Sequence, residues 1–349
     1  HILKYGEYPL VGPYNLLYES GVRNSPLYFY ALALLLIPFN HPITLTFFNI
    51  LFQIAVLVLI YLITAKIFDS KVALSAIALL SFSSGVIKQS DYIWQPYLML
   101  PIALLSLYFL MKAYFEKSYK FYIASLITLC LAVALHFSAL IWVSVALFTG
   151  KILLWGRPLK YFLGSIGVVV ITLGLLYAST LPFQSFKNLS SPVVVSSISG
   201  YFNNLTLNLE EVLNMFNISF YFLFLILAIS IALYAKGLIK TKWFTVTIFM
   251  FFLPIILASF INKIRPNYLI FSLAPFIIWV ASFISITSQG LGKLFIFLLI
   301  FTILSNNLNF FRTEKPLENL RYIEKVADKI LVELNLIKNS KRAESFNFF

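Results

Sequence analysis

Apolar stretches whose central parts contain no Asp, Glu, Lys or Arg recur along most of the chain. Because lipid offers backbone groups no hydrogen-bond partners, a stretch of about 20 such residues is expected to cross a membrane as a helix. Only 11% of the residues are charged, against about 25% in soluble domains. The sequence therefore predicts an all-α multi-pass membrane protein. The apolar stretches cover residues 43–65, 72–87, 97–115, 121–150, 161–182, 213–235, 243–261, 267–286 and 294–306.

The distribution of Lys and Arg indicates which connections face the cytoplasm, because short loops rich in these residues stay on that side of a membrane. Stretch 121–150 is long for one span. Only if it turns back near His136, in "LHFSA", do all four basic clusters fall on one side. We therefore expect about ten spans in an integral plasma (inner) membrane protein. The clusters are Lys66 and Lys71; Lys112, Lys117 and Lys120; Lys151, Arg157 and Lys160; and Lys236, Lys240 and Lys242.

The formal net charge of +13 is explained by the membrane and not by nucleic acid. The basic residues lie in short loops between apolar stretches, where the positive-inside rule accounts for them. Membrane lipids are therefore expected as partners, and nucleic acid is not expected as one.

Three regions are expected along the chain. Residues 1–42 form an extracytoplasmic, interfacial segment, residues 43–306 form the helical bundle, and residues 307–349 form an extracytoplasmic tail. Apolar residues recur in the tail at helical spacing, which predicts an amphipathic helix and the start of a small truncated domain. Because the sequence begins with His1 and ends on "SFNFF", we expect a fragment of a longer protein.

The stretch "GVRNSPLYFYALALLLIPF" is apolar but too short to span a bilayer. Pro26 suits the first turn of a helix, and Arg23 and Asn24 stand before it, where a helix N-terminus favours an anion. Tyr28 and the next two aromatic residues fit a belt at headgroup level. A surface helix that holds Arg23 over a lipid phosphate is therefore predicted. An ordinary amphipathic anchor with a solvated Arg23 is the alternative.

The connection "KQSDYIWQPY" crowds polar and aromatic residues between two spans. Trp94 can stack on a sugar, Gln95 can bond sugar hydroxyls, and Asp91 can act as a base or hold a sugar, with Lys88 close by. A belt tryptophan and a helix-starting proline are the alternative explanation.

His136 is the one histidine within the central apolar region. A substrate-binding role competes with a structural hydrogen-bonded role at the helix break. The span centres hold no Asp, Glu, Lys or Arg, which argues against an ion-coupled transporter. A site at the outer membrane surface, supplied with a lipid-borne substrate, is expected instead.

These stretches, in this order, resemble bacterial membrane glycosyltransferases of the GT-C class, in the protein-mannosyltransferase-like superfamily that includes the lipid A aminoarabinose transferases and the dolichyl-phosphate-mannose-protein mannosyltransferases. The motifs are Gly12-Pro13 with "RNSPLYFY", then "SDYIWQP", then "LHFSA", and finally "RPNYLIFSLAP" with Arg265 and Tyr268. The resemblance covers residues 1 to 290. It implies a GT-C-like helical bundle with an interfacial helix and a truncated soluble tail.

The resemblance implies transfer of a sugar from a polyprenyl-phosphate donor to an extracytoplasmic acceptor, which is a hydroxyl of a glycan, lipid or protein. Arg23, Lys88 and Arg265 are the expected cations for the donor phosphate. Gln95 and Asp91 depart from the family's Asn and Arg, and the family's acidic motif would fall before His1. The main base is therefore expected outside this fragment, which as given is expected to be inactive, with Asp91 a lesser candidate.

Two alternatives stay open: a carrier or flippase for lipid-linked sugars, and an inactive membrane scaffold. No residues have metal-ligand spacing, no cofactor is certain, and a divalent metal stays open.

Overall fold

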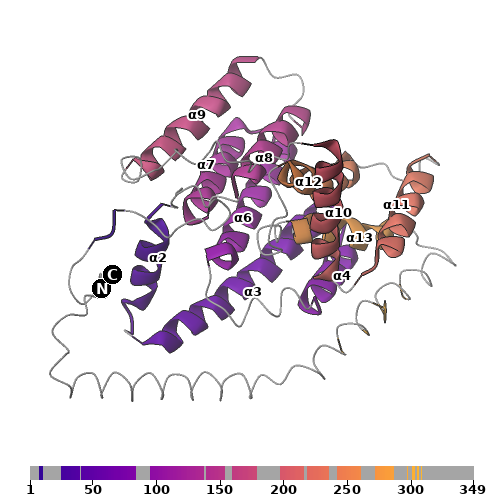
Figure 1. Ribbon diagram of the computed structural model, residues 1–349, viewed down its shortest axis with the longest axis horizontal. Helices are drawn as coiled ribbons and strands as arrows, with labels where there is room; N and C mark the ends of the chain where they lie inside the picture. The colour runs from indigo at the N-terminus through magenta and orange to yellow at the C-terminus, as the bar shows by residue number, and fades with distance from the viewer. Residues whose placement is uncertain are drawn as a thin grey trace. The chain divides into compact units, whose positions relative to one another are not determined.

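A computed structural model describes residues 8–10, 25–39, 41–83, 95–136, 139–153, 159–178, 197–215, 218–235, 242–260 and 272–286, with positions 297, 301, 302, 305 and 308 (Figure 1). Within these residues there are eleven helices and no strand, which confirms the all-α prediction for that part of the chain. The helices are α2 Leu27–Leu36, α3 Pro42–Ile67, α4 Ser70–Ser81, α6 Gln95–Phe115, α7 Tyr119–Leu135, α8 Leu140–Leu153, α9 Leu159–Tyr177, α10 Ile198–Asn214, α11 Phe220–Ala235, α12 Lys242–Ser259 and α13 Leu273–Ile286.

Side-chain caps fix where several helices begin. The Asp69 carboxylate accepts a hydrogen bond from the Val72 N–H at 2.9 Å, and this starts α4 two residues after α3 ends. The Ser197 hydroxyl accepts from the Gly200 N–H at 3.1 Å and starts α10 in the same way. Each cap satisfies a donor that the first helical turn leaves unpaired.

The helix break near His136 is present. α7 ends at Leu135, His136 has extended backbone angles, and α8 begins at Leu140. The stretch 121–150 is therefore two helices, as the charge argument predicted.

Helix α10 corrects an expectation from the sequence. The apolar pattern predicts one helix over residues 213–235; instead α10 covers Ile198–Asn214 and α11 begins only at Phe220. α10 is amphipathic, so its apolar residues alternate with polar ones and form no continuous stretch. It ends where the Ile218 N–H donates to the Leu213 carbonyl at 3.1 Å.

Described helix ends that border the basic clusters converge at one end of the bundle, which we call the lysine end. The Lys66 ammonium at the end of α3 lies 5.7 Å from the ring centroid of Phe115, at the end of α6. Phe115 in turn stacks on Trp243, at the start of α12, with ring centroids 6.3 Å apart. The Tyr119 hydroxyl, at the start of α7, donates to the Tyr161 carbonyl, at the start of α9, at 2.8 Å.

The other helix ends meet at the opposite end, which we call the His136 end. The Tyr177 hydroxyl, at the end of α9, donates to the Val133 carbonyl near the end of α7 at 2.8 Å. The Ser83 hydroxyl, after α4, donates to the Met215 carbonyl, after α10, at 3.0 Å. Successive helices from α3 to α9 therefore alternate in direction, as expected for a chain that crosses a membrane repeatedly; α3, α6 and α7 lie side by side (Figure 1).

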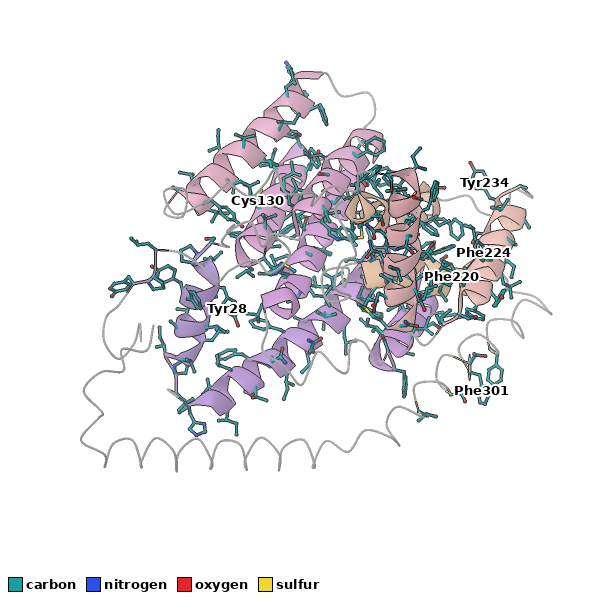
Figure 2. The ribbon with its side chains drawn as sticks, in the orientation of Figure 1. Tyr28, Cys130, Phe220, Phe224, Tyr234 and Phe301 are labelled. Atoms are coloured by element: carbon teal, nitrogen blue, oxygen red, sulfur yellow. The ribbon has the colours of Figure 1, made fainter. Side chains whose placement is uncertain are left out.

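Three described helical segments are long and apolar enough to cross a membrane: Ile43–Ile67, Leu98–Phe115 and Lys160–Tyr177. Several shorter helices are equally apolar, including α11, along which Figure 2 labels Phe220, Phe224 and Tyr234. Phe224 and Tyr234 are more than half exposed. Soluble proteins rarely expose contiguous apolar surface of this kind, so these helices are compatible with insertion in lipid.

Helix α13 lies in the interior of the bundle. Every residue from Leu273 to Phe283 is buried, against neighbours that include α4 and α12. A helix that is apolar on all sides and buried on all sides is the centre of a bundle. Residues 305–349 form a unit separate from residues 1–304. The predicted amphipathic tail helix, from residue 317 onward, lies outside the described residues.

Helices α7 and α8 approach closely at Gly150, where an added Cβ would collide with the ring of Tyr122. Tyr122 is buried and 3% exposed, so it has little space to move. We expect Gly150→Ala to lower the free energy of unfolding by about 2 kcal/mol, the usual cost of overpacking. Thermal unfolding of the detergent-solubilised protein measures it.

Gly167 and Gly174 in α9 are matched controls, because an added Cβ at either position meets nothing within 4 Å. Alanine there is expected to be neutral or slightly stabilising. If Gly150→Ala behaved like these two variants, the close approach of α7 and α8 would be wrong.

Candidate functional site

His136 occupies the turn between α7 and α8 and is buried, with 3% of its surface exposed. The backbone N–H of His136 donates to the Ala132 carbonyl at 3.0 Å, and the backbone carbonyl of His136 accepts from the Ala139 N–H at 3.1 Å. Burial lowers the pKa of His136 from the usual 6.5 to about 4. At neutral pH the imidazole is therefore uncharged, and it can donate or accept a hydrogen bond but cannot attract a phosphate as a cation.

The start of α2 is tied to the same end of the bundle. Ser25 is buried, and its hydroxyl donates to the Leu176 carbonyl at 2.9 Å, next to Tyr177. Since Tyr177 bonds to Val133, these contacts link the N-terminus of α2 to the ends of α9 and α7. Arg23 and Asn24 directly precede Ser25 in the chain, so this tether fixes the end of the segment that carries them, although both residues lie outside the described part.

Tyr28 faces protein and not lipid. It is buried at 9% exposure on α2, which packs on α3 and α7 (Figure 2). The prediction that Tyr28 belongs to a belt of aromatic residues at headgroup level is therefore wrong. On Tyr30, the hydroxyl donates to the Pro9 carbonyl at 2.8 Å, which adds a contact with the N-terminal segment.

The other predicted site residues are carried by connections that leave from the His136 end. Gln95 is the first residue of α6, and its side chain is not described. The connection from Ser83 to Gln95 and the one from Phe260 to Ser272 both join helix ends at this end. Lys88, Asp91, Trp94, Arg265 and Tyr268 lie in these connections, outside the described residues.

Helix α10 brings a polar group to the same end that sequence reasoning missed. The Asn208 side-chain amide, fully buried, donates to the Ser259 hydroxyl at the end of α12 at 3.1 Å. Asn204, one turn earlier, donates to the Ser259 carbonyl at 3.5 Å. The four-residue spacing of Asn204 and Asn208 could have indicated two amides on one face of a helix. Buried amides need hydrogen-bond partners, so such a face predicts a polar contact with another element.

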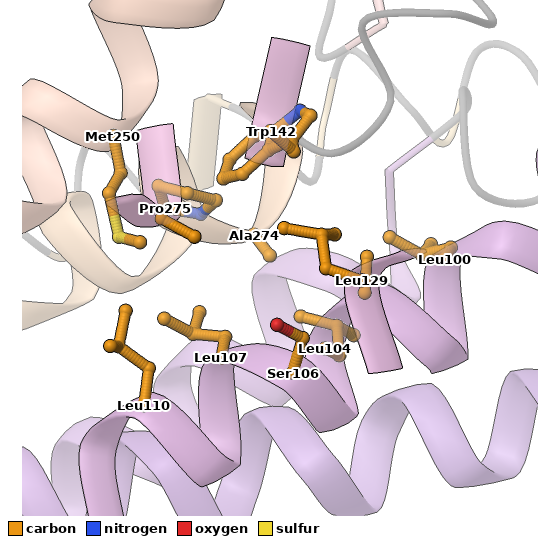
Figure 3. A pocket seen from close by; sticks show the side chains of 12 residues that line it. Leu100, Leu104, Ser106, Leu107, Leu110, Leu129, Trp142, Met250, Ala274 and Pro275 are labelled. Atoms are coloured by element: carbon orange, nitrogen blue, oxygen red, sulfur yellow. The ribbon is translucent and has the colours of Figure 1, made fainter. Parts of the chain in front are cut away.

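A small cavity of about 20 Å³ lies between α6, α7, α8, α12 and α13 (Figure 3). Ser106 is among its lining residues, and its hydroxyl already donates to the Ser125 carbonyl at 2.8 Å. Such a volume holds about one water molecule, so the cavity is too small for a sugar or a lipid chain. The lining is Leu100, Ala103, Leu104, Ser106, Leu107, Leu110, Leu129, Trp142, Ala146, Met250, Ala274 and Pro275.

No group of three or more His, Cys, Asp or Glu that could hold a metal ion occurs among the described residues. Comparisons with protein-family models, curated proteins and solved structures found no match for this chain.

Proposed function

We propose that this chain is an integral multi-pass membrane protein, with the lysine end in the cytoplasm and the His136 end at the extracytoplasmic surface. The support is the alternation of helix direction together with the exposed apolar residues of α3, α9 and α11. The positive-inside rule assigns the basic connections to the cytoplasm.

At the extracytoplasmic surface we propose a GT-C-like glycosyltransferase that uses a polyprenyl-phosphate sugar donor and an acceptor hydroxyl of a glycan, lipid or protein. One observation carries the proposal. Every motif of the resemblance lies at, or in a connection that leaves from, the His136 end: the segment before Ser25, the connection 84–94, the turn at His136 and the connection 261–271. A site assembled from these four segments would lie where a donor in the outer leaflet exposes its phosphate.

The proposed reaction is a displacement at the anomeric carbon. A carboxylate base removes the proton of the acceptor hydroxyl, the oxygen forms a bond to the anomeric carbon, and the bond from that carbon to the phosphate oxygen breaks. The lipid phosphate leaves with the electron pair, and Arg23, Lys88 and Arg265 are proposed to stabilise its charge. Neutral His136 lies at the turn between α7 and α8 and is not among these cations.

Donor binding tests the proposal without requiring turnover. The chain is reconstituted in zwitterionic nanodiscs, and binding of a fluorescent polyprenyl-phosphate hexose is measured by anisotropy. Arg23→Ala is expected to weaken binding at least tenfold, because a hydrogen bond to a charged group contributes about 1.5–3 kcal/mol. Arg23→Lys is expected to retain part of the affinity, since it keeps the charge but not the planar fork.

Lys120→Gln is the matched control, because Lys120 is exposed at the lysine end. Its donor affinity is expected to equal that of the wild type. An Arg23→Ala protein with wild-type affinity would remove Arg23 from the site. Movement of labelled donor between leaflets with no sugar transfer would favour the carrier, and absence of donor binding would favour the scaffold.

A further inference from the structure

The lysine end presents exposed cations from several different helices. Lys66, Lys71 and Lys160 have exposed side chains at the ends of α3, α4 and α9. On α6, the Lys112 side chain is 31% exposed. These lysines belong to four different helices and do not form one cluster in the sequence, which suits a ligand present in many copies.

Lys66, Lys71 and Lys160 each have a large exposed apolar side chain one helical turn deeper in the bundle. On α3, Leu62 precedes Lys66 by four residues and is 42% exposed. Leu74 and Leu163 follow Lys71 and Lys160 by three residues and are 61% and 57% exposed. Residues three or four apart share one face of a helix. Each pair therefore presents a cation above an apolar side chain on the same surface.

Aromatic rings lie close to Lys66, Lys112 and Lys160. The Lys66 ammonium lies 5.7 Å from the ring centroid of Phe115, and the Lys160 ammonium lies 5.6 Å from that of Tyr161. The Lys112 ammonium lies 5.9 Å from the ring centroid of Tyr108, one turn deeper on α6. Tyr and other amphipathic aromatic residues favour the boundary between lipid headgroups and acyl chains.

Acidic residues do little to neutralise the charge of these lysines. Among the described residues of the lysine end the acids are Asp69 and Glu116. Asp69 caps α4, and Glu116 pairs with Lys112 at 3.6 Å. Lys66, Lys71 and Lys160 are left with an excess of positive charge around them.

We propose that these lysine–leucine pairs bind anionic phospholipids, with the ammonium on the headgroup phosphate and the leucine on the first acyl carbons. The inference rests on the proposed insertion in a membrane, but not on the proposed transferase activity. Phospholipid is favoured over nucleic acid, because a sugar-phosphate backbone offers nothing apolar to Leu62, Leu74 and Leu163. It is favoured over an acidic protein because the proposed insertion places these leucines beside the acyl chains of the lipid. Basic residues next to membrane spans gain affinity from anionic headgroups through the same electrostatic attraction.

Lipid selectivity in reconstituted bilayers tests the proposal. The association of spin-labelled phosphatidylglycerol with the chain is compared with that of spin-labelled phosphatidylcholine by electron paramagnetic resonance. We expect selectivity for phosphatidylglycerol in the wild type, a loss of about fivefold at the affected positions for each lysine replaced, and little selectivity in Lys66→Gln/Lys71→Gln/Lys160→Gln. The corresponding triple Arg variant keeps the charges and is expected to keep the selectivity.

Lys160→Gln and Lys120→Gln form a matched pair. Both remove one exposed charge from the lysine end, but the residues three and four positions deeper than Lys120, Ile123 and Ala124, are only partly exposed. Selectivity is expected to fall more for Lys160→Gln. Equal losses, or an unchanged triple Gln variant, would overturn the lysine–leucine site.

A soluble anion is the remaining competitor. If inositol hexakisphosphate abolished the phosphatidylglycerol selectivity at micromolar concentration, the lysines of the lysine end would form a soluble-anion site and the proposal would fail. Absence of any motionally restricted lipid would reject membrane insertion itself. Restricted lipid without selectivity would reject only the inference.

Discussion

Replacing Trp279 with alanine is expected to lower the free energy of unfolding by about 4 kcal/mol, the usual cost of emptying a buried aromatic site. Trp279 is fully buried at the middle of α13. Its ring packs against Phe251 and Phe276, with centroids 6.0 and 5.9 Å away. Its indole N–H donates to the Ser230 hydroxyl of α11 at 3.1 Å. One side chain therefore joins α11, α12 and α13, and its loss affects all three.

Titration with a denaturing detergent, followed by circular dichroism, measures the effect. Trp279→Phe keeps most of the ring and loses the N–H, so it is expected to cost only about 1 kcal/mol for the hydrogen bond within the apolar bundle. Leu175→Ala is the control for an apolar truncation at the surface, since Leu175 is 75% exposed on α9. If Trp279→Ala were no worse than Leu175→Ala, α13 would not be the centre of the bundle.

The helices that the sequence predicted well are those whose apolar character is continuous. α3, α6 and α12 match their predicted stretches within a few residues. The break at His136 was predicted from charge alone, because a chain that alternates between two faces must place each basic connection consistently. No continuous apolar stretch marks α10 in the sequence, because its apolar residues alternate with polar ones on an amphipathic helix.

The candidate site was only partly accessible to sequence reasoning. Motifs predicted which connections would carry the proposed chemistry, but contacts between distant segments leave no local signal. The Ser25–Leu176 bond joins residues 151 positions apart, and nothing about either residue suggests the other. Tyr28 looked like an interfacial aromatic residue because its neighbours are apolar, whereas α2 turns it toward the bundle.

The two ends of the bundle carry different kinds of connection, and this difference supports a binding site at the His136 end. Long polar connections and the only described buried histidine belong to one end, while short basic turns belong to the other. Lys117, with a φ of 50°, lets α6 turn directly into α7, and such a turn leaves little chain for a binding site. A site built from loops is therefore expected at the His136 end, where the chain supplies them.

Acidification should destabilise the protein through His136. Burial lowers its pKa from 6.5 to about 4 in the folded state, whereas the unfolded chain keeps a value near 6.5. Above pH 6.5 both states hold a neutral imidazole, so the full stability is present. As the pH falls from 6.5 toward 4 the unfolded state binds a proton that the folded state does not. At about 1.4 kcal/mol for each pKa unit, this shift costs about 3 kcal/mol by pH 4.

His136→Gln isolates this contribution, because carboxyl groups titrate in the same range in both proteins. Thermal unfolding is measured from pH 7.5 to 4, and the quantity of interest is the difference in pH dependence between wild type and variant. Gln can hydrogen-bond in the turn but does not titrate, so the variant should lose less stability on acidification even if it begins less stable at pH 7.5. Parallel pH profiles would mean that the histidine is solvated or paired with a charge in the folded state. The imidazole would then not be buried and neutral in the folded protein. His136 could carry a positive charge and would be a candidate for binding the donor phosphate.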